Sequence, residues 1–229
     1  MSELKGPSVS IVDYQMGNVC SVQRACEAVG LAAVITADPA RIESADGVIL
    51  PGVGAFGDAM ESLHHLGLVE ILHRVVRRQK PLMGICLGMQ LLMTESDEFG
   101  LHAGLNLLDG RVIRFDNPRD DEGRILKVPQ VGWNRIRPTT QSGDWKGSIL
   151  EGLACDADMY FVHSYFVVPR DPSIILAVSR YGQIDFASVI QAGALFACQF
   201  HPEKSGPAGI SIYRNFRAKL ESVRRECLV

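Results

Sequence analysis

The stretch Pro81-Leu82-Met83-Gly84-Ile85-Cys86-Leu87-Gly88 joins a short apolar run directly to a Gly-x-Cys-x-Gly turn. Apolar residues at helical spacing follow through Met93, so the pattern predicts a buried strand, a sharp turn and a helix. A sharp turn strains the backbone at its apex, and flanking glycines remove the side chains that would collide there. The sequence therefore predicts that Cys86 lies at the carboxyl end of a strand, beside the first amides of a helix.

Short apolar runs and helical stretches alternate through the first half of the chain. One predicted helix begins at an Asn18 cap and stops at Gly30, and a second covers residues 58–79 with a break at Gly67. This alternation predicts βαβ units on a parallel sheet, whose functional sites lie at the carboxyl ends of the strands. The predicted strands are residues 9–12, 32–35, 47–50 and 81–85.

The second half consists of strand-like pieces separated by turns, which predicts an antiparallel extension of the sheet. Residues 116–127 are rich in charge, and we interpret them as a solvated loop, with a binding role as the alternative. Residues 210–223 have the pattern of a closing amphipathic helix. We expect one domain over residues 1–229. The strand-like pieces are residues 111–113, 134–136, 159–162, 165–168, 174–179, 186–190 and 195–200, the last of which returns to the main sheet.

Composition excludes several classes of protein. Hydrophobic residues make up 47% of the chain and charged residues 21%, as in globular domains, and the net charge of −3 gives no reason to expect nucleic acid or an anionic membrane. Residues 1–7 lack the apolar core of a signal peptide, and no apolar run reaches the roughly 18 residues of a membrane span. We therefore expect a cytoplasmic protein whose cysteines are mostly buried thiols rather than disulfides.

Cys86 has the position of a nucleophile in an elbow. The amide N–H groups of the following helix favour a thiolate and supply a donor for an oxyanion, with Leu87 N–H the nearest. The alternative is a structural cysteine between two glycines, which the strand-before and helix-after context makes the weaker interpretation.

His201 is the candidate base for this thiol. It follows the apolar residues 195–200, and Pro202 stiffens its link to Glu203, whose carboxylate can fix the imidazole tautomer. The alternative is a surface His and Glu in a turn. Among the other histidines only His163 is a rival base, and it has no carboxylate close in sequence.

Two distant motifs together resemble the class I (triad) glutamine amidotransferases. These are Gly84-Ile85-Cys86-Leu87-Gly88-Met89-Gln90 and Gln199-Phe200-His201-Pro202-Glu203. Further segments between Val12 and Lys204 resemble the glutaminase subunit of imidazole glycerol phosphate synthases: Val12-Asp13-Tyr14, Met16-Gly17-Asn18, residues 50–56, Val128-Pro129, Gly132-Trp133-Asn134 and residues 160–165. The resemblance implies a flavodoxin-like α/β domain that hydrolyses glutamine with Cys86, His201 and Glu203.

The resemblance also implies binding roles. Val53 N–H, after a peptide flip between Gly52 and Gly54, is expected as the second oxyanion donor beside Leu87. Gln90 is expected to bind the α-amino or carboxylate end of glutamine, and Ser164 and Tyr165 to offer backbone contacts. The alternatives are a plain strand–helix turn at residues 51–54 and a strand turn with a buried Tyr165.

By the same resemblance, the partner is a (β/α)8-barrel cyclase that receives the ammonia in a one-to-one heterodimer. The expected interface residues are Gly17, Asn18, Trp133, Tyr160 and Lys204, although Trp133 and Tyr160 fit a core equally well. Gln15 and Gln130 depart from the family pattern in segments expected to face the partner. They leave open a paralogous subunit that feeds ammonia to a surface-polysaccharide synthase.

Two other functions remain as alternatives: a binding module that has lost catalysis, and a stand-alone cysteine hydrolase. The intact Cys86, His201 and Glu203 argue against the first. No His, Cys, Asp or Glu cluster has metal-ligand spacing, and Gly52-Val53-Gly54 fits neither phosphate-loop pattern. We therefore expect no cofactor and no metal.

Overall fold

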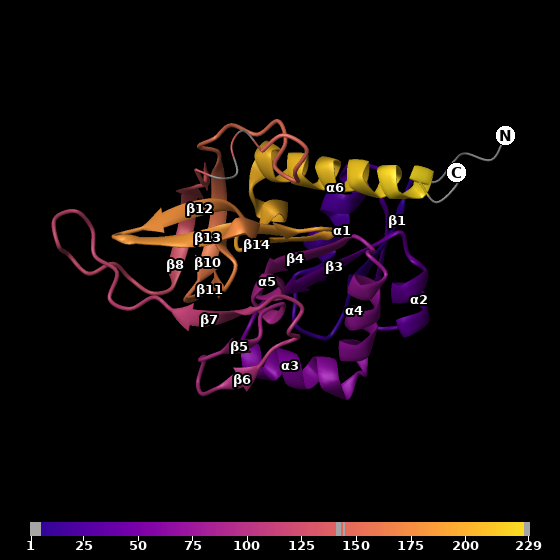
Figure 1. Cartoon of the computed structure of the whole chain (residues 1–229), viewed down its shortest axis with the longest axis horizontal. Coiled ribbons are helices and arrows are strands. Elements are labelled where there is room, and N and C mark those ends of the chain that lie inside the picture. Colours follow the sequence, from indigo (N-terminus) through magenta and orange to yellow (C-terminus); the bar gives the residue numbers. More distant parts are fainter. Residues whose placement is uncertain (1–5, 141–142, 144, 227–229) are drawn as a thin grey trace.

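The computed structural model describes residues 6–140, 143 and 145–226, and within them an eight-stranded sheet lies between two layers of helices (Figure 1). The strand order is β2-β1-β3-β4-β14-β13-β12-β9. The first five of these strands are parallel and the last three antiparallel, which confirms the predicted parallel sheet and its antiparallel extension. The strands are β1 (Ser8–Val12), β2 (Ala32–Thr36), β3 (Gly47–Gly52), β4 (Leu82–Cys86), β14 (Leu195–Cys198), β13 (Ile184–Ala192), β12 (Ile175–Tyr181) and β9 (Arg137–Pro138).

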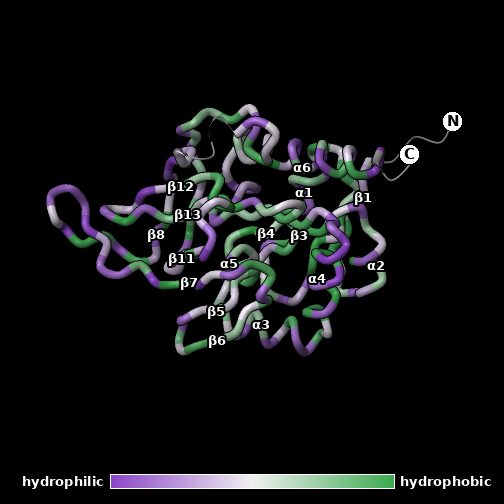
Figure 2. The backbone as a smooth tube through the Cα atoms, viewed as in Figure 1, coloured by the Kyte–Doolittle hydropathy of each residue, from purple (hydrophilic) through white to green (hydrophobic). Residues whose placement is uncertain are grey.

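Side-chain alternation divides the core of the protein between the two faces of this sheet. Along β3, Ile49 packs into one hydrophobic cluster while Val48 and Leu50 pack into the other. Successive strand residues point to opposite faces, so a strand covered by helices on both sides must be apolar throughout. Figure 2 shows this as hydrophobic colour concentrated along the central strands.

Helices α1 (Val19–Ala28) and α6 (Gly206–Glu226) cover one face, and α2 (Pro39–Ser44), α3 (Phe56–His65), α4 (Leu68–Arg77) and α5 (Leu87–Leu91) the other (Figure 1). The predicted break at Gly67 is confirmed, because this residue adopts a left-handed conformation between α3 and α4. Asn18 does stand at the N-cap position of α1, but its side chain makes no capping hydrogen bond.

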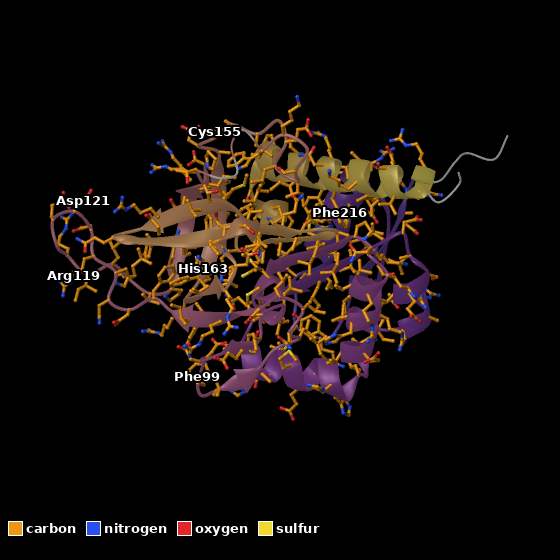
Figure 3. All side chains as sticks on the ribbon, in the orientation of Figure 1. Phe99, Arg119, Asp121, Cys155, His163 and Phe216 are labelled. Atoms are coloured by element: carbon orange, nitrogen blue, oxygen red, sulfur yellow. The ribbon has the colours of Figure 1, made fainter. Side chains whose placement is uncertain are left out.

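Two smaller sheets extend the antiparallel half. One pairs β8 (Gln130–Arg135) with β10 (Asp158–His163), and the other has the order β11-β7-β5-β6. Residues 116–127 leave the body as a mostly exposed loop, with Arg119 and Asp121 near its far end (Figure 3). This exposure agrees with the solvated-loop interpretation. The remaining elements are β5 (Glu95–Ser96), β6 (His102–Ala103), β7 (Gly110–Arg114), β11 (Tyr165–Pro169), η1 (Pro172–Ile174) and η2 (Pro202–Lys204).

Several predicted boundaries were wrong. Strand β14 ends at Cys198 rather than at residue 200, α5 ends before Met93, and β8 begins four residues before the predicted start at residue 134. Helix α2 was not predicted, although Asp38 followed by Pro39 is a helix-start signal and the Asp38 side chain accepts from Ala40 N–H. The expectation about a signal peptide falls mainly on residues 1–5, outside the described part of the chain, as does Cys227.

The five cysteines in the described ranges, Cys20, Cys26, Cys86, Cys155 and Cys198, are all free. Within those ranges, the structure contains no helix with the length and apolar character that crossing a membrane requires.

Candidate active site

The turn at Cys86 has the strained geometry that its glycines predict. Cys86 joins β4 to α5 with φ 55° and ψ −112°, a conformation that L-residues rarely adopt. A Cβ atom at Gly88 would lie only 1.8 Å from the carbonyl oxygen of Leu50, so no side chain fits where α5 passes β3. The elbow therefore requires glycine at position 88, and it holds the Cys86 sulfur at the carboxyl edge of the sheet.

His201 and Glu203 reach the same edge because β14 lies next to β4. In the parallel register Cys198 is opposite Ile85, so the residues that follow β14 lie beside the elbow. His201 Nδ1 lies 2.8 Å from Glu203 Oε1, and both side chains are buried, at 3% and 1% exposure. The main-chain N–H of His201 donates to Tyr160 O at 2.9 Å, which fixes the base against β10.

The environment of His201 favours the imidazolium form. Burial alone lowers its pKa, but hydrogen bonding to Cys86 and to Glu203, together with their charges, raises the pKa to about 10. The contact with Cys86 is looser than the one with Glu203, since Nε2 forms no hydrogen bond of regular geometry to any described residue. The arrangement suits a thiolate–imidazolium pair in which Glu203 fixes the imidazole tautomer.

His163, the rival base, lacks this support. Its Nδ1 lies 2.8 Å from the Tyr165 carbonyl, which can only accept, so Nδ1 carries the proton. Burial lowers the pKa of His163 to about 4, and no carboxylate offsets it. The ring packs against Phe115, Phe161 and Phe186. His163 is therefore a neutral imidazole in the wall of the site, and the structure favours His201 as the base.

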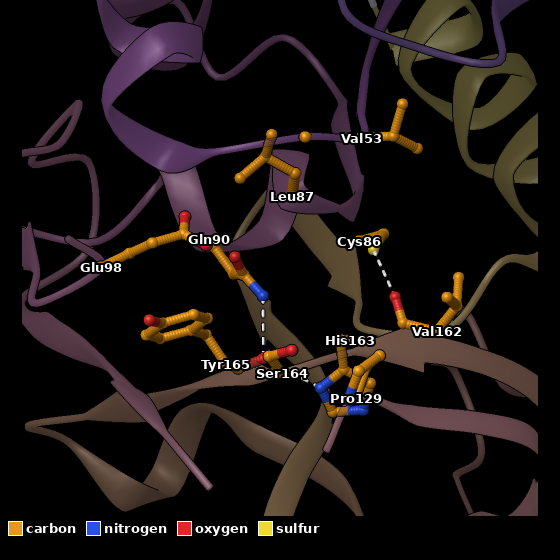
Figure 4. A pocket seen from close by; sticks show the side chains of 11 residues that line it. Val53, Cys86, Leu87, Gln90, Glu98, Pro129, Val162, His163, Ser164 and Tyr165 are labelled. Atoms are coloured by element: carbon orange, nitrogen blue, oxygen red, sulfur yellow. Dashed lines mark hydrogen bonds between the residues drawn. The ribbon is translucent and has the colours of Figure 1, made fainter. Parts of the chain in front are cut away.

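A cavity of about 320 Å³ opens beside the sulfur (Figure 4). Most of the predicted binding residues line it: Val53, Gly54, Leu87, Gln90, Ser164 and Tyr165, with Cys86 itself. Gly52 does not; it is buried beneath the cavity, where a Cβ would lie 2.2 Å from the Tyr14 hydroxyl oxygen. The volume suits an amino-acid-sized ligand held next to the nucleophile.

The two predicted oxyanion donors flank the sulfur. Gly52 pairs with Cys86 across β3 and β4, so Val53 is the first residue past the strand and Leu87 the first of α5. Gly54 has φ +108°, a left-handed conformation that glycine adopts without strain. The Tyr14 hydroxyl donates to Pro51 O at 2.7 Å, which holds the peptide before this segment in place.

Gln90 makes more hydrogen bonds within the protein than the sequence suggested. Its Nε2 donates to Tyr165 O at 2.9 Å and to Gln199 Oε1 at 3.1 Å, which uses both amide hydrogens. The remaining polar atom, Oε1, can only accept. Gln90 is therefore suited to an ammonium group and not to a carboxylate.

Four residues of the cavity wall were not predicted as binding residues, although His163 was considered as a base: Glu98, Pro129, Val162 and His163. Glu98 is the chemically important one, since it is the only carboxylate among the described residues that line the cavity. Its Oε2 accepts from Phe56 N–H at 2.6 Å, and burial raises its pKa. It lies in a short loop after β5, and an acidic residue in a charged Ser-Asp-Glu run gave no periodic signal that would single it out.

Three of the expected interface residues form one cluster at the surface, in which Trp133 and Lys204 are exposed and Tyr160 is half-buried. Trp133, at 59% exposure, meets the Tyr160 ring edge-on at 6.0 Å between centroids, and Lys204 Nζ lies 5.9 Å from the centre of that ring. Gly17 and Asn18 lie in the loop after β1, and both are half-buried.

The two residues that depart from the family pattern lie in different environments. Gln15 is exposed, whereas the Gln130 side chain is buried, at 4% exposure. Its neighbour Val131 is the exposed residue instead, at 59%, because alternate residues of β8 point outward.

Comparison with known proteins agrees with this geometry. The family model "Glutamine amidotransferase class-I" matches residues 10–220. The chain belongs to the class-I glutamine amidotransferases.

Relatives within the glutamine amidotransferases are similar over nearly the whole chain. A protein of Syntrophotalea carbinolica named "Imidazole glycerol phosphate synthase subunit HisH" is 47% identical, covering 91% of this chain and 98% of the relative. Proteins with the same name from Geobacter sulfurreducens and Moorella thermoacetica are 46% and 45% identical, covering 97% and 93% of their lengths.

Solved structures of distant proteins share the fold. PurLQS from Thermotoga maritima superposes with a TM-score of 0.65 at 18% identity, covering 94% of this chain and 99% of that one. The glutaminase domain of CTPS from Trypanosoma brucei gives a TM-score of 0.61 at 17% identity, covering 94% of both chains. In the part of this amidotransferase that the structure describes, no group of three or more His, Cys, Asp or Glu side chains could hold a metal ion.

Proposed function

We propose that this chain is the glutaminase subunit of an imidazole glycerol phosphate synthase, acting as one domain over residues 1–229. It hydrolyses glutamine to glutamate and ammonia, and a cyclase subunit uses the ammonia to make imidazole glycerol phosphate and AICAR in histidine biosynthesis. The observation that carries the chemistry is that Cys86 lines a ligand-sized cavity and interacts with the buried His201–Glu203 pair. The HisH relatives, one of which is 47% identical, support the pathway.

Each side chain has a role that its surroundings support. The Cys86 thiolate attacks the side-chain amide carbon of glutamine, and the amides of Leu87 and Val53 stabilise the oxyanion that forms. His201, protonated at neutral pH, donates a proton to the departing ammonia. A γ-glutamyl thioester then remains on Cys86. His201 then takes a proton from water, which attacks the thioester and releases glutamate.

The α-amino and α-carboxylate groups of glutamine lie further along the cavity in this proposal. The Glu98 carboxylate and Gln90 Oε1 can both accept from the α-ammonium, while the main chain of Ser164 and Tyr165 lines the wall next to the α-carboxylate. Such fixed polar groups orient the substrate so that its amide reaches the sulfur.

The partner surface lies next to the point where ammonia forms. The two-stranded sheet β8–β10 carries Trp133 and Tyr160 on its outer side, and its residue Val162 lines the cavity, with the carbonyl oxygen 3.9 Å from Cys86 Sγ. Exposed aromatic residues are common interface anchors. We propose that a (β/α)8-barrel cyclase docks here as a one-to-one heterodimer in the cytoplasm, with Gly17, Asn18 and Lys204 at the rim.

The test combines the purified chain with a cyclase subunit of an imidazole glycerol phosphate synthase and its ribonucleotide substrate, and follows glutamate release. The proposal predicts that release rises steeply only when cyclase and nucleotide are both present, and that Cys86→Ala abolishes it. Release that depends on Cys86 but ignores the cyclase would retain the glutaminase chemistry and refute the partner assignment.

A further inference from the structure

Gln199 belongs to the Gln-Phe-His-Pro-Glu motif, yet the steps above give its side chain no role. The residue is fully buried just beyond β14, at 0% exposure. Its Nε2 donates to Cys86 Sγ at 3.8 Å, and its Oε1 accepts from Gln90 Nε2 at 3.1 Å. The side chain thus joins the nucleophile to a residue of the cavity wall.

The orientation of this amide follows from its neighbours. The oxygen and nitrogen of an amide have nearly the same shape, so the hydrogen-bond partners decide which atom points where. The Tyr165 carbonyl can only accept, and it therefore turns Gln90 Nε2 toward itself at 2.9 Å. The second hydrogen on that nitrogen then points to Gln199 Oε1, which leaves the Gln199 N–H groups for the sulfur.

A donor at this position matters more for a thiolate than for a thiol. Besides its interaction with His201, the sulfur lies 3.9 Å from Val162 O, which can accept from the thiol but repels the negative sulfur. Cys86 is 6% exposed, so water gives a thiolate little solvation. A hydrogen bond to a charged group is stronger than one between neutral groups.

We propose that Gln199 is a further residue of the catalytic machinery, an inference that rests on the proposed function. Its amide N–H holds the Cys86 sulfur and stabilises the thiolate, and the Tyr165–Gln90 hydrogen bonds keep that donor turned toward the sulfur.

Substitution of Gln199 by methionine removes this donor and also the Oε1 atom that accepts from Gln90 Nε2, whereas Gln199→Glu removes the donor and keeps an acceptor for Gln90. Met has a similar length and no N–H, and the exchange leaves the charges around the sulfur unchanged. The titratable groups close to Cys86, to His201 or to the cavity are His201, Glu203, Tyr14, Cys198, His163, Tyr165 and Glu98. A fall in Cys86 reactivity that Gln199→Met and Gln199→Glu share therefore reports the lost hydrogen bond to the sulfur.

The measurement is the rate at which iodoacetamide alkylates Cys86 between pH 5 and 10, resolved by peptide mass spectrometry, with neither glutamine nor partner present. A hydrogen bond to a charged group is stronger than a neutral one, but this hydrogen bond is long. We therefore expect a moderate effect: roughly 10-fold slower alkylation near neutral pH, a midpoint of the alkylation profile about one pH unit higher and a roughly 10-fold lower kcat/KM. Gln191→Met is the matched control, since Gln191 Oε1 accepts from Ile149 N–H in the β13 region.

Gln199→Glu provides a second variant of the same shape, which places a carboxylate beside the sulfur and should slow alkylation further. If Gln199→Met does not fold, alkylation of Gln199→Glu alone tests whether Gln199 stabilises the Cys86 thiolate. Parent-like alkylation profiles in the folded variants, even with a lowered melting temperature, would overturn the inference and leave a structural role. If the profiles shift while the parent chain releases no glutamate with any cyclase, the inference stands and the proposed function fails.

Discussion

Glu203→Gln should lower the pKa of His201 by a predictable amount. The parent pair is buried, with 2.8 Å between His201 Nδ1 and Glu203 Oε1. A hydrogen bond between charged groups contributes about 1.5–3 kcal/mol, and one pKa unit corresponds to about 1.36 kcal/mol. Removing the charge should therefore reduce the pKa from about 10 to roughly 8–9. The Cys86 contact remains in the variant, so the pKa should stay above the ordinary histidine value of about 6.5.

The assay is an NMR titration of the His201 ring nitrogens, assigned with a His201→Gln variant. Glu98→Gln is the control, because it removes the carboxylate that lines the cavity, whose charged neighbours are His102, Asp58 and Asp97 rather than His201. An unchanged His201 midpoint in Glu203→Gln, or an equal fall in Glu98→Gln, would refute the pairing. Glutaminase kcat should also fall by about 10²- to 10⁴-fold, since a glutamine side chain can hold the wrong imidazole tautomer.

The same raised pKa has a consequence for the stability of the folded chain. Because the folded-state pKa lies above the unfolded one, His201 stabilises the fold fully below about pH 6.5, and this contribution is lost as the pH rises through about 10. The difference limits the contribution to roughly 5 kcal/mol. In Glu203→Gln the pKa of His201 is lower, so the stabilisation by His201 should disappear at a lower pH than in the parent chain. Urea denaturation between pH 6 and 10 can measure this difference.

Three further substitutions test separate parts of the account. Gly88→Ala places a Cβ 1.8 Å from Leu50 O, so it should lower the free energy of unfolding by about 3 kcal/mol or more. The control Gly67→Ala has open space around the new Cβ and should lower it by only about 1 kcal/mol. Urea denaturation measures both. Glu98→Gln should raise KM for glutamine roughly 10-fold with a smaller change in kcat, because the lost charge acts on the bound α-ammonium. Trp133→Ala should weaken cyclase binding by about 2 kcal/mol in calorimetry while Cys86 alkylation stays at the parent rate; tight binding by this variant would remove Trp133 from the interface.

Sequence periodicity predicted the parallel half of the fold well because each of its strands is buried on both faces. Continuous apolar runs such as residues 47–50 and 81–85 have few other interpretations in a chain with helical stretches between them. The antiparallel half was located less accurately. Strand β8 begins with a buried Gln130 and carries an exposed Val131 and Trp133, so the usual link between polarity and exposure is reversed there.

The candidate nucleophile and the candidate base could be identified in the sequence because local backbone rules act on both. The glycines around Cys86 and the proline after His201 are signals within a few residues of the chemistry. Glu98 and Gln199 were not predicted as site residues because their roles arise from packing between distant segments: Glu98 meets Phe56, and Gln199 meets Cys86 and Gln90. No pattern within one element encodes such contacts.

The most direct test of the central claim is detection of the covalent intermediate. The chain, its cyclase and the nucleotide would be mixed with glutamine, quenched in acid during turnover and analysed by peptide mass spectrometry. The account predicts a γ-glutamyl thioester on the peptide that carries Cys86 and on no other cysteine peptide. Steady glutamate release without that adduct, or release that persists in Cys86→Ala, would contradict it.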